Sequence, residues 1–222
     1  CTYDPKKANE MLDKLGLDRK DAEGYRLRTD GKGRLRIELL TAAAAFVPYT
    51  LHAEMIREQW KRIGIQADVQ ERERSLAFTR CSNNEHHIML WSNGGSENLY
   101  LFPRHALPVE PTEAFMGALY GKWYGSGGKI GKKPTDPQMV KALELFASAG
   151  GLKEADRIKV AQEIWKILCE EQWSIGTVGQ SPAFMGVRIA KTNMGNIPAR
   201  QANAQHCSCL LYTSDAADEE DS

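Results

Sequence analysis

The sequence lacks an excess of charge of either sign, since its 222 residues hold 29 Lys and Arg against 29 Asp and Glu. This balance argues against a strongly basic nucleic-acid-binding domain and against a wholly disordered acidic chain. Residues 201–222 contain five acidic residues and no Lys or Arg. The remaining 200 residues therefore carry 29 basic and 24 acidic groups, a net charge of +5, which is typical of an ordinary solvated surface.

Long apolar runs and a cysteine framework are also missing. The longest uncharged stretches, Leu39–Ala53 and Trp173–Val187, have 15 residues each and are interrupted by Pro48 and Pro182. A bilayer requires about 20 apolar residues, so no transmembrane helix is expected. The five cysteines have no repeated spacing, which argues against a disulfide framework and a four-ligand zinc site. Cys169 lies among apolar helical residues and is expected to be buried.

What the sequence does contain is an alternation of helix and strand patterns through residues 4–91. Asp4 and Pro5 are typical of a helix start, and Gly16 of a helix end. Two further helices are predicted, one ending at Gly64 and one with Ser75 as its cap. Strands are predicted between and after these helices, at Leu35–Leu39, Ile65–Val69 and His87–Trp91. The order α-β-α-β-α-β predicts an α/β fold in which helices cover a sheet.

The regular pattern fails from Ser92 to Thr135, a stretch rich in Gly, Pro and aromatic residues in which only Thr112–Tyr120 is expected to be helical. A loop of this length inside a domain is usually functional or mobile. Asp136 and Pro137 then begin another helix. An amphipathic helix follows, with an apolar face made of Ile158, Ala161, Trp165 and Leu168. Short strands are possible interpretations of two later segments, Ser174–Gly179 and Val187–Ala190.

No motif identifies a catalytic or metal-binding group. Gly125–Lys133 departs from the phosphate-loop pattern at two positions. His86 and His87 are adjacent on a predicted strand, so they point to opposite faces and do not readily bind one ion. The partial ligand set His206-Cys207-x-Cys209 lies in the C-terminal segment that has no usable period. We therefore expect no cofactor and no metal. An alternative stays open, a hydrolytic enzyme whose active site is a carboxylate pair in the irregular region 92–135.

The candidate binding site is Trp91, Ser92, Asn93 and Gly94, at the end of the third predicted strand. Ligands of open α/β sheets bind beyond the carboxyl ends of strands. An aromatic side chain there can stack on a ligand, and a glycine-rich backbone offers hydrogen-bonding groups. A buried Trp followed by an ordinary turn is the other interpretation, and the residues alone do not favour either.

Four segments in order resemble family 5 of the extracellular solute-binding proteins, the dipeptide, oligopeptide and nickel group of ABC importers. They are Tyr3–Ala8, Ala53–Val69, His87–Trp91, and the pair Trp173–Gly179 and Asn193–Pro198. The resemblance implies the C-terminal lobe of a two-lobe periplasmic-binding-protein-like fold, with a mixed sheet flanked by helices. Residues 1–172 would form this lobe of an incomplete protein, and residues 173–200 would return toward the other lobe. Residues 201–222 would be a disordered or artefactual tail.

The resemblance also implies a function. Such a protein is not an enzyme but the substrate-binding component of an importer, which encloses a peptide or other small solute between two lobes and delivers it to the permease subunits. It is periplasmic or extracellular, and contacts the membrane only through the transporter or an N-terminal anchor. Peptide-binding members commonly carry Asp three residues after the Trp, where this sequence has Gly94. The class of solute therefore stays open.

Overall fold

The computed structural model describes residues 3–43, 47–92, 99–100, 102–112 and 114–177. The chain divides into two compact units, Cys1–Ser92 with Glu110–Lys133 (unit 1) and Asn93–Val109 with Pro134–Ser222 (unit 2). The candidate strand at Val187–Ala190 and the acidic C-terminal segment lie outside the described residues.

Unit 1 is built on a parallel sheet with strand order β2-β1-β3. Its strands are β1 (Arg36–Ala42), β2 (Gln66–Arg72) and β3 (Ile88–Met89). Arg36 pairs with Gln66 at one end and Ala42 with Arg72 at the other, while Leu39 and Leu40 of β1 pair with β3. The predicted α/β class is confirmed. The antiparallel strand that a mixed sheet requires is not found in this sheet among the described residues.

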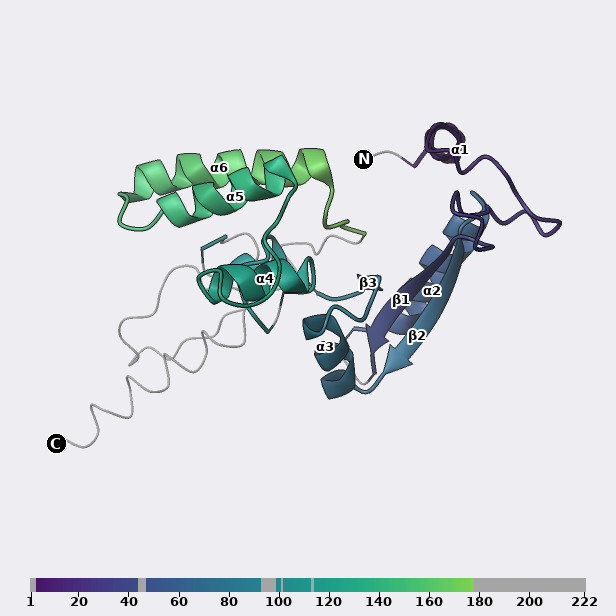
Figure 1. Cartoon of the computed structure of the whole chain (residues 1–222), viewed down its shortest axis with the longest axis horizontal. Helices are drawn as coiled ribbons and strands as arrows, with labels where there is room; N and C mark the ends of the chain where they lie inside the picture. Colours follow the sequence, from purple (N-terminus) through teal and green to yellow (C-terminus); the bar gives the residue numbers. More distant parts are fainter. Residues whose placement is uncertain (1–2, 44–46, 93–98, 101, 113, 178–222) are drawn as a thin grey trace, which may run out of the picture. The chain divides into compact units, whose positions relative to one another are not determined.

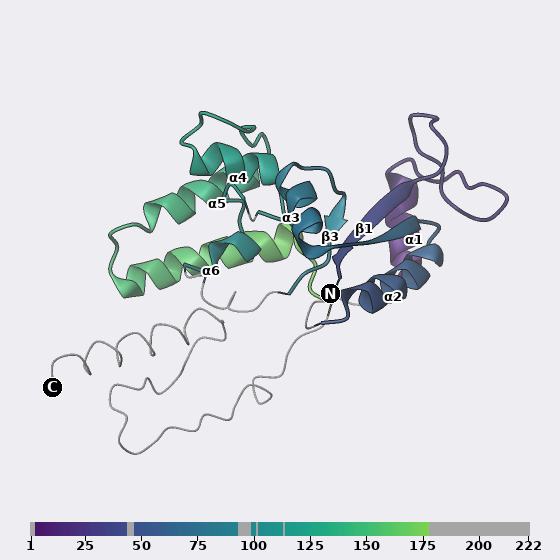
Figure 2. The same cartoon turned by 90° about the horizontal axis from the view of Figure 1, so that it is seen from below.

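Helices cover both faces of this sheet because successive residues of each strand point to opposite sides. On one face, α2 (Tyr49–Lys61) buries Ala53 against Leu39 and Ala67. On the other, α3 (Arg74–Ser82) packs Ala77 and Cys81 on the core side chains of β1. Figures 1 and 2 show α2 running along β1 and β2. The core of unit 1 therefore consists of two apolar layers separated by β1.

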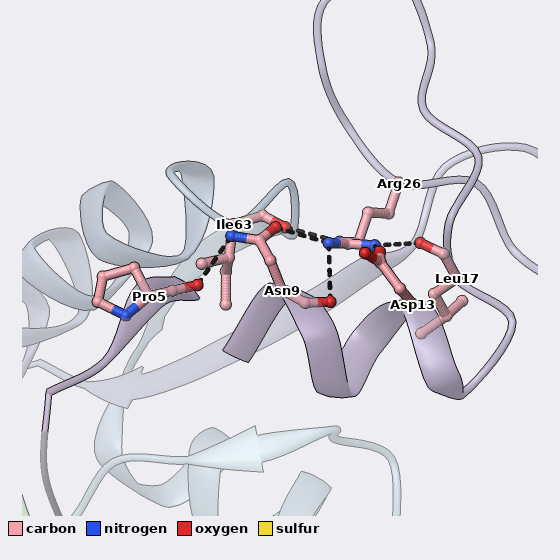
Figure 3. A network of polar contacts seen from close by, with 6 residues as sticks. All are labelled: Pro5, Asn9, Asp13, Leu17, Arg26 and Ile63. Carbon is pink, nitrogen blue, oxygen red and sulfur yellow. Dashed lines mark hydrogen bonds and ion pairs between the residues drawn. The ribbon is translucent and has the colours of Figure 1, made fainter. Parts of the chain in front are cut away.

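Helix α1 (Pro5–Lys14) forms where its capping residues predict it. The Asp4 carboxylate accepts a hydrogen bond from the Lys7 N–H at 2.9 Å, and Gly16 has a φ of +79° just after the helix. Arg26 then ties α1 to the end of α2, as Figure 3 shows. Its guanidinium donates to the Asp13 carboxylate at 2.6 Å, to the Asn9 side chain at 2.6 Å and to the Ile63 carbonyl at 2.8 Å.

Three predictions for unit 1 are wrong in their bounds. Glu73, not Ser75, caps α3, since its carboxylate accepts from the Leu76 N–H at 3.1 Å. The strand predicted at His87–Trp91 is confined to Ile88–Met89, the residues that pair with β1. The helix predicted at Thr112–Tyr120 lies later, as α4 (Ala118–Gly125). Its start is fixed by Gly117, whose left-handed φ of +61° interrupts a helix.

Unit 2 contains a short 3₁₀ helix η1 (Pro103–His105) and two longer helices, α5 (Pro137–Ser148) and α6 (Glu154–Glu171), which run side by side (Figures 1 and 2). The predicted start of α5 is confirmed, because the Asp136 carboxylate accepts from the Met139 N–H at 2.8 Å. In α6 the buried residues are Ile164, Ile167 and Leu168, whereas Ile158 is 50% exposed.

The prediction that Cys169 is buried is wrong, since the residue is exposed. It follows the buried Leu168 directly, and one step along a helix turns the next side chain by about 100° away from the buried face. The described part of the candidate strand Ser174–Gly179, residues 174–177, has no strand structure.

Candidate functional site

The carboxyl edge of the unit 1 sheet is where the ends of three strands and the starts of two helices lie. Strands β1 and β2 end at Ala42 and Arg72, and Trp91 follows β3. Helices α2 and α3 begin at the same edge with Tyr49 and Arg74. In open α/β sheets this edge is the usual place for a ligand.

A chain of hydrogen bonds joins the two longer strands at this edge. The Thr41 and Thr50 hydroxyl oxygens lie 2.9 Å apart, and the Thr50 hydroxyl donates to the Glu71 carboxylate. Because a hydroxyl has one proton, the Thr50 proton is committed to Glu71, and Thr41 must donate to Thr50. The end of β1, the first turn of α2 and the end of β2 are thereby held in fixed positions.

An aromatic cluster, consisting of Tyr49, Phe78, Trp91 and Phe115, lies at the same edge. The Trp91 ring stacks on Tyr49 with centroids 5.1 Å apart, meets Phe78 edge to face at 5.0 Å, and lies 6.0 Å from Phe115. Trp91 and Phe115 are partly buried and pack on the α3 side of the core. The Trp91 side chain is therefore both a support of the core and a part of the surface at the strand ends.

Two polar groups accompany the aromatic cluster. The guanidinium of Arg74 lies over the Trp91 ring, 5.4 Å from its centroid, and 5.6 Å from that of Phe78. The Tyr49 side chain is only 4% exposed, and its hydroxyl has no hydrogen-bond partner among the described residues. The carboxylate of neighbouring Glu73 accepts hydrogen bonds from the backbone N–H groups of Ser75 and Leu76. These bonds hold the pKa of the carboxyl below its ordinary value.

The structure describes two of the four predicted site residues. Trp91 and Ser92 are half-buried at the sheet edge, while Asn93 and Gly94 lie outside the described residues. The sequence analysis missed the residues that surround Trp91: Tyr49, Arg74, Phe78 and Phe115. A signal for two of them was present, because Arg74 and Phe78 stand at i and i+4 in the helix that leaves the second strand.

The other groups considered for chemistry serve the fold. The His86 Nε2 lies 2.9 Å from the Phe115 carbonyl oxygen, and the His87 Nδ1 accepts from the Glu38 N–H at 3.0 Å. The Ser126 hydroxyl accepts from the N–H groups of Lys129 and Ile130, which closes the glycine-rich loop on itself. Within the described ranges no group of three His, Cys, Asp or Glu is arranged to hold a metal ion.

A hollow of about 510 Å³ lies elsewhere, on the polar part of the sheet. Its lining includes Arg36, Glu38, Asp68 and His87. Arg36 pairs with Asp68 at 3.0 Å, and Glu38 pairs with Arg80 at 3.1 Å. Both pairs bring opposite charges together, whereas the Arg74 guanidinium has no ion pair among the described residues.

Comparisons with known proteins agree with the fold. Residues 2–100 match the family described as "Bacterial extracellular solute-binding proteins, family 5 Middle". Di/tripeptide-binding protein 1 of Pseudomonas aeruginosa (strain UCBPP-PA14) is 29% identical over 196 residues, which are 84% of this chain and 30% of that protein. No helix in the described part of the chain has the length and apolar character needed to cross a membrane.

Solved structures of solute-binding proteins have the same fold. The oligopeptide-binding protein OppA is 25% identical with a TM-score of 0.64, over 77% of this chain and 28% of that one. MelB from Agrobacterium fabrum C58, in complex with stachyose, is 14% identical with a TM-score of 0.65, over 78% of this chain and 25% of that one. AppA from Bacillus subtilis, in complex with a nonapeptide, is 24% identical with a TM-score of 0.53, over 77% of this chain and 30% of that one.

The chain thus spans 30% of the curated relative and 25–30% of these three structures. The family match covers the sheet of unit 1 and the Trp91 edge, and the structural similarity extends over most of the chain. Residues 2–100 thus match family 5 of the bacterial extracellular solute-binding proteins, and most of the chain is similar to members of the solute-binding proteins in sequence and fold.

Proposed function

We propose that this chain is part of the substrate-binding component of an ABC importer, which captures a peptide or other small solute outside the cytoplasm and delivers it to the permease. Residues 1–172 act as the ligand-binding lobe and residues 173–200 lead back toward the other lobe. The observation that carries the proposal is the aromatic and polar cluster at the carboxyl edge of the sheet, within the residues that match this family.

The hydrolase alternative has less support. The irregular region 92–135 holds three glutamates, of which the structure describes only Glu110, so no carboxylate pair is described there. The relatives and solved structures reported above are binding proteins. Peptide and sugar ligands both occur among those structures, so the comparisons leave the solute class open.

Native mass spectrometry of the complete protein that contains this chain tests the proposal. After gentle purification we expect a non-covalently bound solute, which leaves on denaturation and which the protein does not alter during long incubation. The added solute should also be taken up by cells that carry the permease and ATPase. Conversion of the solute into a product would contradict the binding role and favour the hydrolase.

Trp91, Ser92, Asn93 and Gly94 remain the proposed ligand contacts, and Trp91→Ala tests them. Loss of a buried aromatic anchor costs about 2 kcal/mol of binding energy, roughly a thirtyfold loss of affinity. Because Trp91 also packs on the core, Tm should fall as well, and titration calorimetry must be done well below it. Trp60→Ala is the control, since Trp60 packs on the other face of the sheet and should lower only Tm. Unchanged affinity in Trp91→Ala would assign that residue to the core alone.

A further inference from the structure

Arg74 differs from most arginines of unit 1 in having no acidic partner among the residues that the structure describes. Six others form ion pairs with carboxylates: Arg26, Arg28, Arg34, Arg36, Arg57 and Arg80. Within the described residues, the Arg74 guanidinium has no ion pair, and it lies over the rings of Trp91 and Phe78. It is exposed and stands at the first residue of α3, at the carboxyl edge of the sheet.

The nearest acidic residues in the sequence do not neutralise Arg74. The Glu73 carboxylate accepts from the Leu76 N–H at 3.1 Å and from the Ser75 hydroxyl at 3.4 Å, so it is committed to the start of α3. The Glu71 carboxylate accepts from the Thr50 hydroxyl. A guanidinium that rests on aromatic rings keeps its N–H groups in the plane of the fork, where they fit the two oxygens of a carboxylate.

The Tyr49 hydroxyl is a second polar group without a partner at the same indole. The Tyr49 ring stacks on Trp91 at 5.1 Å, and the side chain is 4% exposed with no hydrogen bond to the hydroxyl from any described residue. A buried hydroxyl left without a partner costs about 1–3 kcal/mol, and a ligand oxygen that accepts its proton removes that cost. The Trp91 indole thus contacts both the Tyr49 ring and the Arg74 guanidinium.

We propose that Arg74 binds a carboxylate of the transported solute, with the Tyr49 hydroxyl as a second donor to the same solute. This inference rests on the proposed function and adds the chemical class of the solute. A neutral sugar is the less favoured occupant, because it would use an open aromatic face. The Trp91 ring is instead stacked by Tyr49 and covered by Arg74, which presents charge where a sugar would need a flat apolar surface.

The test uses the complete protein with pairs of probes that differ in a carboxylate. The pairs are trialanine against trialanine amide and galacturonate against galactose, with stachyose as a neutral oligosaccharide. Titration calorimetry at fixed salt should show that the wild-type protein prefers the acid of at least one pair by tenfold or more. Arg74→Gln should abolish this preference, Arg74→Lys should retain part of it, and Tyr49→Phe should lower affinity for the acid several-fold.

Arg72→Gln is the matched control for loss of positive charge at the same edge. The Arg72 guanidinium donates to the Gln70 side chain at 2.6 Å and to the Glu71 carbonyl at 2.9 Å, so its removal should leave the preference unchanged. Melting curves of every variant separate loss of binding from loss of folding.

Three results would overturn the inference: equal binding of acid and neutral probes, an unchanged acid preference in Arg74→Gln, or no response to either acid. The wild-type protein and Arg74→Gln can also be compared with a neutral solute, either stachyose or one that co-purifies. Equal binding of that solute by both proteins would contradict the assignment of a carboxylate to Arg74 and would leave the importer role intact. A wild-type protein that carries no solute and binds no probe would contradict the importer role as well.

Discussion

At the scale of single residues, Arg26 is the side chain whose loss should disturb the fold of unit 1 most directly. Its guanidinium is 1% exposed and has five N–H groups. All five are used, on the Asp13 and Asn9 side chains and on the carbonyls of Asn9, Leu17 and Ile63 (Figure 3). Removing the side chain would leave several of these acceptors without a donor.

We therefore expect Arg26→Leu to lower the free energy of unfolding by about 3 kcal/mol, since breaking a buried charged network leaves its partners unpaired. Urea denaturation measures this change. Arg28→Gln is the control, because the pair between Arg28 and Asp30 lies on the surface and should contribute little. Similar midpoints for the two variants would show that the network around Arg26 is not needed for stability.

The two described cysteines should differ in reactivity. Cys81 is 1% exposed, and burial raises the pKa of its thiol to about 11, whereas Cys169 is exposed. Because the thiolate is the reactive form, iodoacetamide at pH 8 should label Cys169 in minutes and Cys81 only after denaturation. Peptide mapping by mass spectrometry distinguishes the sites. Equal labelling in the folded protein would contradict the burial of Cys81 between α3 and the sheet.

The predictions that failed at single residues concern contacts between elements, which depend on how distant segments pack. A helical period predicts that residues near Cys169 have a buried face, but the exact phase of that face depends on the partner helix. Similarly, the pattern identified Trp91 at a strand end, while its contacts with Tyr49 and Phe115 depend on how distant segments pack. Local sequence predicts position along an element better than contact across elements.

At the scale of elements, helix starts were predictable where a strong signal stood alone. Asp4-Pro5 and Asp136-Pro137 combine a carboxylate cap with a proline, and both start helices. At α3 the sequence offers two capping residues, Glu73 and Ser75. In the structure the Glu73 carboxylate accepts from the Leu76 N–H and caps the helix. At α4 the start depends on the left-handed Gly117, a conformation that the pattern of apolar residues does not report.

The loop after α4 should depend on Gly131 for a steric reason. Gly131 has a φ of +85°, and a Cβ added there would lie 2.3 Å from the Leu119 carbonyl oxygen and 2.6 Å from the Trp123 nitrogen. Gly127 also has a positive φ, of +63°, but a Cβ there would meet nothing within 4 Å. Both Gly→Ala changes place a Cβ on a left-handed backbone, which destabilises each variant by about 1–2 kcal/mol.

Only in Gly131→Ala does the added Cβ also clash with neighbouring backbone atoms, so its Tm should fall several degrees below that of Gly127→Ala. Differential scanning calorimetry measures both variants. Equal melting temperatures would mean that the loop moves aside at Gly131 without loss of stability.

At the scale of the whole molecule, the order of elements and the fold class were predictable because each strand and helix of residues 4–91 has its own periodicity. The segment 92–135 was not, since it has no regular apolar period and glycines such as Gly117 and Gly131 take left-handed conformations there, which a pattern of apolar residues does not report. The chain also spans 25–30% of the three solved structures described above, and this bears on its surface. Two large apolar side chains one turn apart on α2, Leu51 and Met55, are 60% and 61% exposed.

If the chain is part of a larger protein, as proposed, the 222-residue chain alone should self-associate through such surfaces. Leu51→Gln/Met55→Gln should reduce light scattering and dye binding by the isolated chain while changing Tm little, because exposed positions contribute little to folding. Ile158→Gln is the control. Ile158 is 50% exposed and, as a single apolar residue on α6, should have a smaller effect. A wild-type chain that is monomeric and binds no dye, or a double variant that associates as strongly, would show that this face of α2 needs no covering partner.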